Sequence, residues 1–288
     1  MSAYVELVRA PAALTVVGDT VAGAAAAGVP LRGRRRLLPL ASTAFYWAGM
    51  ALNDWADRDL DAVERPERPI PSGRVSANAA LATGAALTAA GLALARLGGG
   101  ARAWRTAVPL AACLWAYDTA LKGTALGPAG MAACRALDVL MGASGRERAA
   151  LPAAGALGVH TFGVTTLSTG EVHGTNARTA GSALAATVTS AASAAVARRR
   201  SPAVGGRARR AATAAFAGAY ALTVGRAQYA ALRNPSAQRV REATKAGIHG
   251  MVPLQATIAA RHGAVRAATL LVTALPLARR LARKVSPT

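Results

Sequence analysis

Long stretches without charged side chains constrain this chain more than any other feature. A helix that crosses a bilayer needs about 20 largely apolar residues, and stretches near that length recur throughout the 288-residue sequence. The uncharged or nearly uncharged windows cover residues 10–31, 37–53, 77–95, 106–117, 123–145, 149–170, 179–197, 211–225, 246–260 and 267–278. They predict an all-α, multi-pass transmembrane bundle of about nine helices, or ten if the last two windows are separate spans.

A soluble helical bundle is the alternative to a membrane bundle. Soluble helices carry charged residues every three or four positions on their outer faces. Charged residues make up 16% of this chain, whereas soluble domains contain about 25%. We therefore expect residues 1–288 to form a single transmembrane domain of an integral membrane protein, located in a bacterial cell membrane.

The chain is strongly basic, with a formal net charge of +21. Its Lys and Arg residues fall in short clusters between apolar stretches, and aromatic residues make up only 4% of the chain. This distribution favours arginines that flank membrane spans over a nucleic-acid groove. We expect the lipid bilayer, and not nucleic acid, as a partner. The basic residues divide almost evenly between the two sides, so they predict no orientation, and the sequence assigns no oligomeric state.

Acidic residues gather where the second apolar window ends. Six of the 13 acidic residues lie between Asp54 and Glu67. If the helix continues, Asp54, Asp57 and Asp61 lie within an arc of about 60°, at about 100° per residue, and Asp59 points elsewhere. Three carboxylates on one face repel each other and require cations, either Mg²⁺ or arginines. We favour a Mg²⁺–diphosphate site over a solvated loop that nearby arginines neutralise.

The order of these residues resembles the UbiA superfamily of membrane-embedded prenyltransferases. The stretch Asn53-Asp54-x-x-Asp57-x-x-x-Asp61 is similar to the first Asp-rich motif of that family, and residues 64–73 are similar to its Arg-Pro-x-x-x-Gly segment. Residues 117–122, Tyr-Asp-Thr-Ala-Leu-Lys, resemble its Tyr-x-x-x-Lys region. The resemblance implies a helical bundle with a polar site at one membrane face.

The resemblance also implies an activity, that of a transferase of alkyl groups other than methyl, in isoprenoid biosynthesis. Such an enzyme moves a prenyl group from an isoprenyl diphosphate to a small-molecule acceptor, with Mg²⁺ as cofactor. The sequence leaves the acceptor and the chain length of the prenyl group open.

The second Asp-rich motif of the family is degenerate in this chain. The corresponding region, residues 169–176, holds no aspartate and one carboxylate, Glu171. Glu171 is also the one acidic residue between Glu147 and Glu242. Its position implies a second metal ligand, with His173 and Asn176 as polar neighbours. The alternative is a turn in which Glu171 pairs with Arg178.

The resemblance assigns a role to each polar residue of the first site. Asp54, Asp57 and Asp61 are expected to hold Mg²⁺, which neutralises the charge that develops on the leaving diphosphate. Lys122 supplies a point cation, and Arg68 matches phosphate with its planar fork. Asn53 orients a carboxylate or a water molecule.

The residue that takes the proton of the acceptor stays open among Asp118, Glu171 and His173. All catalytic and substrate-binding candidates together are Asn53, Asp54, Asp57, Asp61, Arg68, Asp118, Lys122, Arg135 and Glu171.

Ionisable residues inside the apolar windows are functional hypotheses by default. Arg135 and Asp138 are three residues apart and can pair on one helix, or Arg135 can face the substrate. Asp19 stands alone in the first window. His160 is interpreted as a packing residue.

Three alternatives belong to other functional classes. A cation-coupled transporter places single carboxylates near the middle of its spans and has internal repeats, but here the aspartates cluster at a helix end. A soluble terpene-type synthase also uses Asp-rich metal sites, and the uncharged windows oppose it. A non-catalytic relative binds isoprenoids without turnover, which the degenerate second motif allows.

Overall fold

Helices form the whole of the described structure. The computed structural model describes residues 3–195 and 206–285, and no strand occurs within these ranges. The elements are α1 (Ala3–Leu7), η1 (Ala10–Thr15), α2 (Val17–Ala26), η2 (Gly33–Arg36), α3 (Leu37–Ala56), α4 (Arg58–Glu64), α5 (Ala77–Ala116), η3 (Tyr117–Leu121), α6 (Gly127–Ala143), α7 (Glu147–Ser168), α8 (Ala177–Ala195), α9 (Gly206–Arg233), α10 (Ala237–Arg261) and α11 (Val265–Val285). The predicted all-α fold is confirmed.

The number of long helices agrees with the sequence. Within the described residues, nine α-helices have ten or more residues, and α1 and α4 are shorter. Helix α5 contains a break at Gly100, whose φ of 67° is unfavourable for any other residue. The indole N–H of Trp115 donates to the hydroxyl of Thr88 across this break (3.1 Å). The two segments of α5 therefore run antiparallel, and they account for two of the predicted windows.

The first apolar window does not form one long helix. Residues 10–15 form the 3-10 helix η1, and the α-helix α2 begins only at Val17. Arg9, immediately before η1, has a left-handed backbone with φ of 46°. This break matters for the site, because it brings Arg9 and the backbone of η1 to the inside of the bundle.

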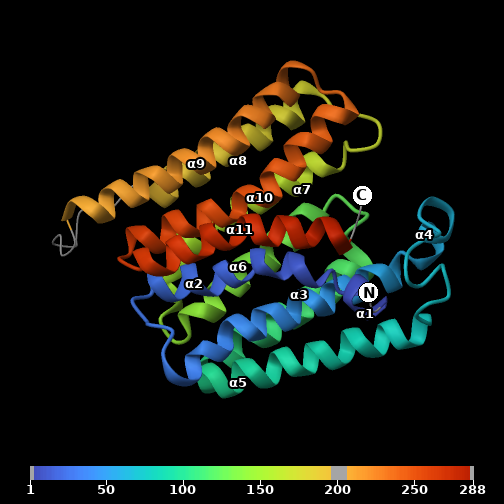
Figure 1. Cartoon of the computed structure of the whole chain (residues 1–288), viewed down its shortest axis with the longest axis horizontal. Helices are drawn as coiled ribbons and strands as arrows, with labels where there is room; N and C mark the ends of the chain where they lie inside the picture. The colour runs from blue at the N-terminus through green and yellow to red at the C-terminus, as the bar shows by residue number, and fades with distance from the viewer. Residues whose placement is uncertain (1–2, 196–205, 286–288) are drawn as a thin grey trace.

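The helices pack side by side (Figure 1). One buried cluster joins α3, α5 and α6 and includes Phe45, Leu52, Leu110 and Met141. A second joins α2, α6, α7, α9 and α10 and includes Leu157, Tyr220 and Leu254. Helix α6 contributes to both clusters, and α4 lies at one end of the bundle, near the N-terminus (Figure 1).

Two helical segments of the described chain are long and apolar enough to cross a membrane. One lies within Ala77–Leu121, the stretch that contains η3 and the two segments of α5, and the other is Glu147–Ser168, which is α7. The other windows lack charges but are rich in Ala and Gly, which are only weakly hydrophobic. Their mean hydropathy is therefore low for a span, even though the sequence predicted nine or ten.

Close packing of α2 against α6 depends on two glycines. A Cβ on Gly142 would lie 2.8 Å from the carbonyl carbon of Thr20, and one on Gly23 would meet the backbone of Val139. We expect Gly142→Ala to lower the free energy of unfolding by about 1–3 kcal/mol, because the backbones must move apart. Gly155→Ala in α7, where no atom lies within 4 Å of the new Cβ, should instead be neutral or stabilising by up to about 1 kcal/mol. Thermal unfolding in detergent checks both, and equal effects would contradict the packing argument.

Candidate active site

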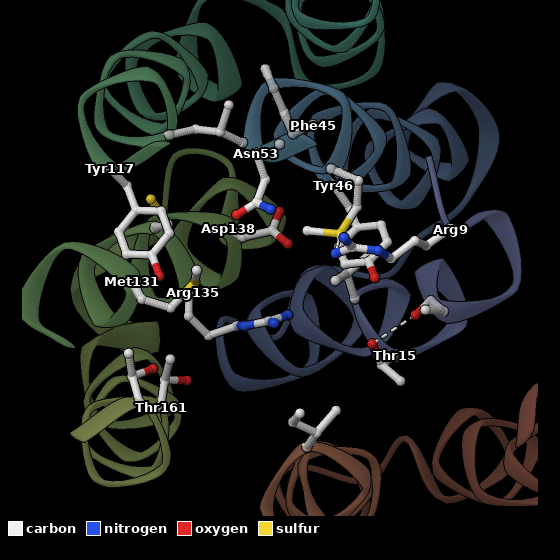
Figure 2. A pocket seen from close by; sticks show the side chains of 18 of the residues that line it. Arg9, Thr15, Phe45, Tyr46, Asn53, Tyr117, Met131, Arg135, Asp138 and Thr161 are labelled. Atoms are coloured by element: carbon white, nitrogen blue, oxygen red, sulfur yellow. Dashed lines mark hydrogen bonds between the residues drawn. The ribbon is translucent and has the colours of Figure 1, made fainter. Parts of the chain in front are cut away.

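A cavity of about 480 Å³ lies beside the buried cluster of α3, α5 and α6, and Phe45, Leu110 and Leu114 of that cluster form part of its wall. Its walls are formed by helix faces that repeat at three- and four-residue spacing, as the periodicity of an α-helix requires. Helix α6 contributes Met131, Cys134, Arg135 and Asp138, and α7 contributes Thr161, Thr165 and Ser168. Figure 2 shows Arg135 and Asp138 of α6 reaching into this space, with Arg9 reaching in from another side.

Helix α3 connects the cavity to the Asp-rich segment. Ser42, Phe45, Tyr46, Gly49, Met50 and Asn53 of α3 line the cavity. Beyond Asn53 the helix ends at Ala56, and Asp57 joins it to α4. The backbone N–H of Asp57 donates to Asn53 (2.9 Å), and that of Asp61 donates to Asp57 (2.8 Å). Helical hydrogen bonding thus continues across the junction, which holds the aspartates close to their predicted spacing.

The structure separates the aspartates into buried and exposed side chains. Asp54 and Asp61 are 4% and 2% exposed, whereas the side chain of Asp59 is 87% exposed. Asp59 points away from the others and pairs with Arg58 at 3.5 Å. Buried carboxylates require compensating cations or hydrogen bonds, because their desolvation is costly.

Four cations meet these carboxylates, and the most distant of them is Arg65, whose Nη1 lies 3.9 Å from Asp61 Oδ1. Arg68 Nη1 lies 2.5 Å from Asp61 Oδ2 and 3.4 Å from Asp54 Oδ1, so one guanidinium bridges both side chains. Arg9 Nη2 approaches Asp54 Oδ1 at 2.8 Å. Lys122 Nζ lies 2.6 Å from Asp57 Oδ1 and donates to the carbonyl oxygen of Asn53 at 3.4 Å. Asp57 therefore faces a different cation from Asp54 and Asp61.

Within the described residues, no group of three or more His, Cys, Asp or Glu side chains is arranged to hold a metal ion. The arginines and Lys122 occupy the space between the carboxylates. The donor set still suits Mg²⁺, which takes one or two carboxylates and completes its shell with water and phosphate oxygens. Asp54 and Asp61, bridged by a single arginine side chain, are the carboxylates best placed for this.

Residues 117–122 reach the same end of the cavity. Tyr117–Leu121 form a π-helical turn, and the N–H of Lys122 donates to the carbonyl of Tyr117 at 3.0 Å. Tyr117 and Lys122 are five positions apart, one more than in a Tyr-x-x-x-Lys spacing, and the wider π-turn accommodates the extra residue. Such π-turns are frequent at functional sites. Tyr117 and the buried Asp118 both line the cavity.

The loop between α7 and α8 contributes Glu171 alone from the degenerate motif. Glu171 lines the cavity, and its backbone carbonyl accepts a hydrogen bond from Arg241 at 2.6 Å. No ion pair with Arg178 occurs in the described part of the chain. His173 is exposed, and Asn176 accepts the N–H of Thr179 (2.9 Å) at the start of α8. His173 and Asn176 are absent from the described lining of the cavity.

Of the two alternatives for Arg135, the ion pair with Asp138 does not occur among the described residues, and Arg135 does line the cavity. Arg135 Nη1 instead pairs with Asp19 Oδ2 at 2.6 Å, and the other oxygen of Asp19 accepts from Gln255 Nε2 at 2.8 Å. Asp138 accepts a hydrogen bond from the hydroxyl of Ser42. The partner of Arg135 is 116 residues away in sequence, so helical spacing within α6 did not reveal it.

Arg9 is the main residue of this site that sequence reasoning missed. The sequence indicates only that Arg9 is a basic residue directly before an apolar window. This position is equally typical of an arginine that contacts lipid headgroups. His160, by contrast, is satisfied as predicted for a packing residue: its Nε2 contacts the carbonyl of Gly247 (3.0 Å) and its Nδ1 contacts the hydroxyl of Tyr220 (2.8 Å).

Comparison with known families gives a match over most of the chain. The model of the UbiA prenyltransferase family matches residues 13–224. A digeranylgeranylglyceryl phosphate synthase from Ignicoccus hospitalis is 38% identical over 126 residues, which cover 44% of this chain and 41% of that protein. The chain thus spans less than half the length of the first curated relatives it matches. These relatives are mainly archaeal, so the comparisons lend no support to the predicted bacterial membrane.

Two solved structures share the fold. A structure described as giving insights into the biosynthesis of digeranylgeranylglyceryl phosphate synthase in membranes has a TM-score of 0.65 at 17% identity, over 92% of this chain and 98% of that chain. The apo structure of a UbiA homologue from Aeropyrum pernix K1 has a TM-score of 0.65 at 18% identity, over 85% and 96% of the two chains.

Proposed function

The chain belongs to the UbiA prenyltransferase family, and we propose that it transfers a prenyl group from an isoprenyl diphosphate to a small-molecule acceptor within the membrane. One observation carries the proposal. Asp54, Asp57 and Asp61 meet four cations just beyond the end of a largely apolar cavity, where Arg9 and Asn53 line its wall. An isoprenyl diphosphate requires both a cationic site for its diphosphate and an adjacent apolar cavity for its hydrocarbon chain.

We propose that the diphosphate binds among the cations at the aspartate end. Arg68 and Lys122 pair with carboxylates, and they would be free to pair with phosphate oxygens if Asp54, Asp57 and Asp61 held Mg²⁺ instead. Glu171 is the candidate for a second metal ligand, because it reaches the cavity from the opposite side, in the loop between α7 and α8. Bound Mg²⁺ supplies stabilisation of the negative charge that develops on the leaving diphosphate.

The walls of the cavity protect the reactive carbon. When the bond between the allylic carbon and the diphosphate oxygen breaks, its electron pair stays with the diphosphate and the carbon becomes electron-poor. Leu114 and Met131 line the cavity nearer this end, Phe45 and Leu110 line it farther along, and together they exclude water. The acceptor then supplies the electron pair for the new bond and loses a proton. Asp118 and Glu171 are candidates for taking it, and His173, being exposed, is the weakest of the three.

The test is diphosphate release by the purified full chain in detergent. Isoprenyl diphosphates of several chain lengths are supplied with pooled cell-extract acceptors, with Mg²⁺ or with EDTA. We expect diphosphate release with Mg²⁺ and a rate at least about 100-fold lower with EDTA, because the main contribution of such a site is stabilisation of developing charge. Tight binding without release would identify a non-catalytic relative. If the chain neither binds isoprenyl diphosphates nor releases diphosphate, the prenyl-transfer proposal is rejected in favour of cation transport.

A further inference from the structure

Three connections between helical segments meet at the end of the bundle opposite the aspartates. They are residues 27–36 between α2 and α3, residues 98–100 at the break in α5, and residues 144–146 between α6 and α7. A Cβ on Gly98 would lie 3.2 Å from the carbonyl oxygen of Arg34, and the hydroxyl of Ser144 donates to the carbonyl of Gly99 at 3.3 Å. In Figure 1 the connection between α2 and α3 lies at the opposite end of the molecule from α4.

This end lies about one bilayer thickness from the aspartates. Arg36 immediately precedes α3, Asp57 immediately follows it, and the helix has 20 residues. An α-helix of that length spans about 30 Å, which is also about the thickness of the hydrocarbon core of a bilayer. We therefore expect the two ends of α3 to lie at opposite headgroup layers.

The cations at the two ends of the bundle differ in their partners. Six cations near the aspartates pair with carboxylates, namely Arg9, Arg58, Arg65, Arg68, Arg74 and Lys122. Eight arginines in or beside the three connections are exposed, namely Arg32, Arg34, Arg36, Arg96, Arg102, Arg105, Arg146 and Arg148. These eight form what we call the basic end, and none of them has an ion pair within the described residues. The even division of basic residues in the sequence did not reveal this difference.

Acidic side chains do not offset the charge of the basic end. Glu147 is the one acidic residue within five positions of any of the three connections. Its Oε1 accepts the backbone N–H of Gly145 at 2.5 Å. The basic end therefore carries a net positive charge that the described part of the chain does not balance.

Exposed apolar side chains lie among the arginines of the basic end. Trp104, between Arg102 and Arg105, is 39% exposed, and Leu97, beside Arg96, is 61% exposed. Tryptophan is enriched where the hydrocarbon core meets the headgroups, and arginine extends its apolar stem along such a surface while its guanidinium stays in the polar layer. This combination is typical of contact with lipid, and a surface for a soluble anion has no need of it.

We propose that the basic end binds the headgroups of anionic phospholipids. Phosphatidylglycerol carries one net negative charge, whereas phosphatidylcholine carries none. A single arginine near the membrane surface enriches an anionic headgroup about fivefold, and the paired cations near the aspartates offer much less attraction. The inference goes beyond prenyl transfer, because lipid binding at this end requires neither Mg²⁺ nor an isoprenyl diphosphate.

Quenching of Trp104 by brominated lipid tests the proposal. The full chain is reconstituted in phosphatidylcholine vesicles that contain equal fractions of either phosphatidylglycerol or phosphatidylcholine, brominated near the headgroup end of the acyl chains. The fluorescence that Trp104→Phe removes reports on the basic end. The fluorescence that Trp55→Phe removes reports on the aspartate end, where the guanidinium carbon of Arg58 lies 5.3 Å from the centre of the Trp55 ring.

We expect brominated phosphatidylglycerol to quench Trp104 at least about twofold more than brominated phosphatidylcholine does. The two lipids should quench Trp55 alike. Equal quenching of Trp104 by the two lipids, or the same preference at Trp55, would overturn the proposal.

Two charge-matched double variants separate the basic end from the other cations of the chain. Arg34→Gln with Arg105→Gln should remove about half or more of the excess quenching of Trp104 by phosphatidylglycerol. Arg178→Gln with Arg233→Gln removes two exposed arginines at the start of α8 and the end of α9, and it should leave that excess unchanged. Equal losses in the two variants would indicate a response to total charge and contradict a local surface.

Inorganic phosphate distinguishes a lipid surface from a site for a soluble anion. Replacing chloride by phosphate at equal ionic strength should leave the preference at Trp104 unchanged, because the two salts screen charge alike. A preference that phosphate abolishes and chloride does not would assign the arginines to a soluble phosphate and reject the lipid surface.

Discussion

Asp54→Asn and Asp61→Asn should each lower Mg²⁺-dependent diphosphate release by about 100-fold or more. The substitution removes a negative charge while keeping the shape of the side chain. Loss of a single preorganised electrostatic group at a site of developing charge costs rates of about this size. Both carboxylates are buried and share Arg68. A water molecule therefore has no room to take the place of a missing carboxylate as a ligand.

Asp59→Asn is the control for this prediction. Asp59 lies in the same short segment, but its side chain is 87% exposed and contacts only the partly exposed Arg58 among the described ion pairs. Release should stay within about twofold of wild type, as for most surface substitutions. Rates are compared per mole of folded protein after size-exclusion chromatography, because the variants at Asp54 and Asp61 leave Arg9 and Arg68 partly unpaired. A folded Asp54→Asn chain with the wild-type rate would assign that carboxylate a purely structural role.

The sequence predicted that Asp54 and Asp61 point away from Asp59, because these positions are close together in the chain. Residues 53–61 belong to helix α3 and its continuation, so their directions follow from the helical period. Arg68 lies only 14 residues beyond Asp54 and returns through a short loop. Most of the uncharged windows likewise predicted the helices, and the first window, which divides into η1 and α2, is the exception.

Contacts between helices were beyond the reach of the same reasoning. Arg9 approaches Asp54 across 45 residues, and Ser42 approaches Asp138 across 96. Such pairs depend on which helix faces meet in the bundle, and an Ala- and Gly-rich surface permits many close packings. The spacing of Arg135 and Asp138 offered a plausible local partner, whereas the fold places Asp19 closer to the guanidinium.

Arg135→Gln should cause the largest loss of stability of any change considered. Asp19 is fully buried, and Arg135 pairs with it at 2.6 Å. Asp138 also interacts electrostatically with Arg135, so removing the guanidinium leaves two buried carboxylates without their cation. Removing one partner of a buried pair costs about 3–5 kcal/mol of unfolding free energy. Thermal unfolding of the full chain in detergent measures it.

The relative unfolding free energies of several variants test this charge arrangement more sharply than the loss of stability in Arg135→Gln alone. Asp19→Asn should destabilise less than Arg135→Gln, because the guanidinium still faces Asp138. Combining the two should restore part of the loss caused by Arg135→Gln, since one of the two uncompensated carboxylates is gone. Glu242→Gln, which breaks the exposed pair with Arg239 at 2.9 Å, should change stability by no more than about 0.5 kcal/mol. Additive losses in the double variant would show that Asp19 and Arg135 contribute independently, and the shared-cation description of the deep end of the cavity would then be wrong.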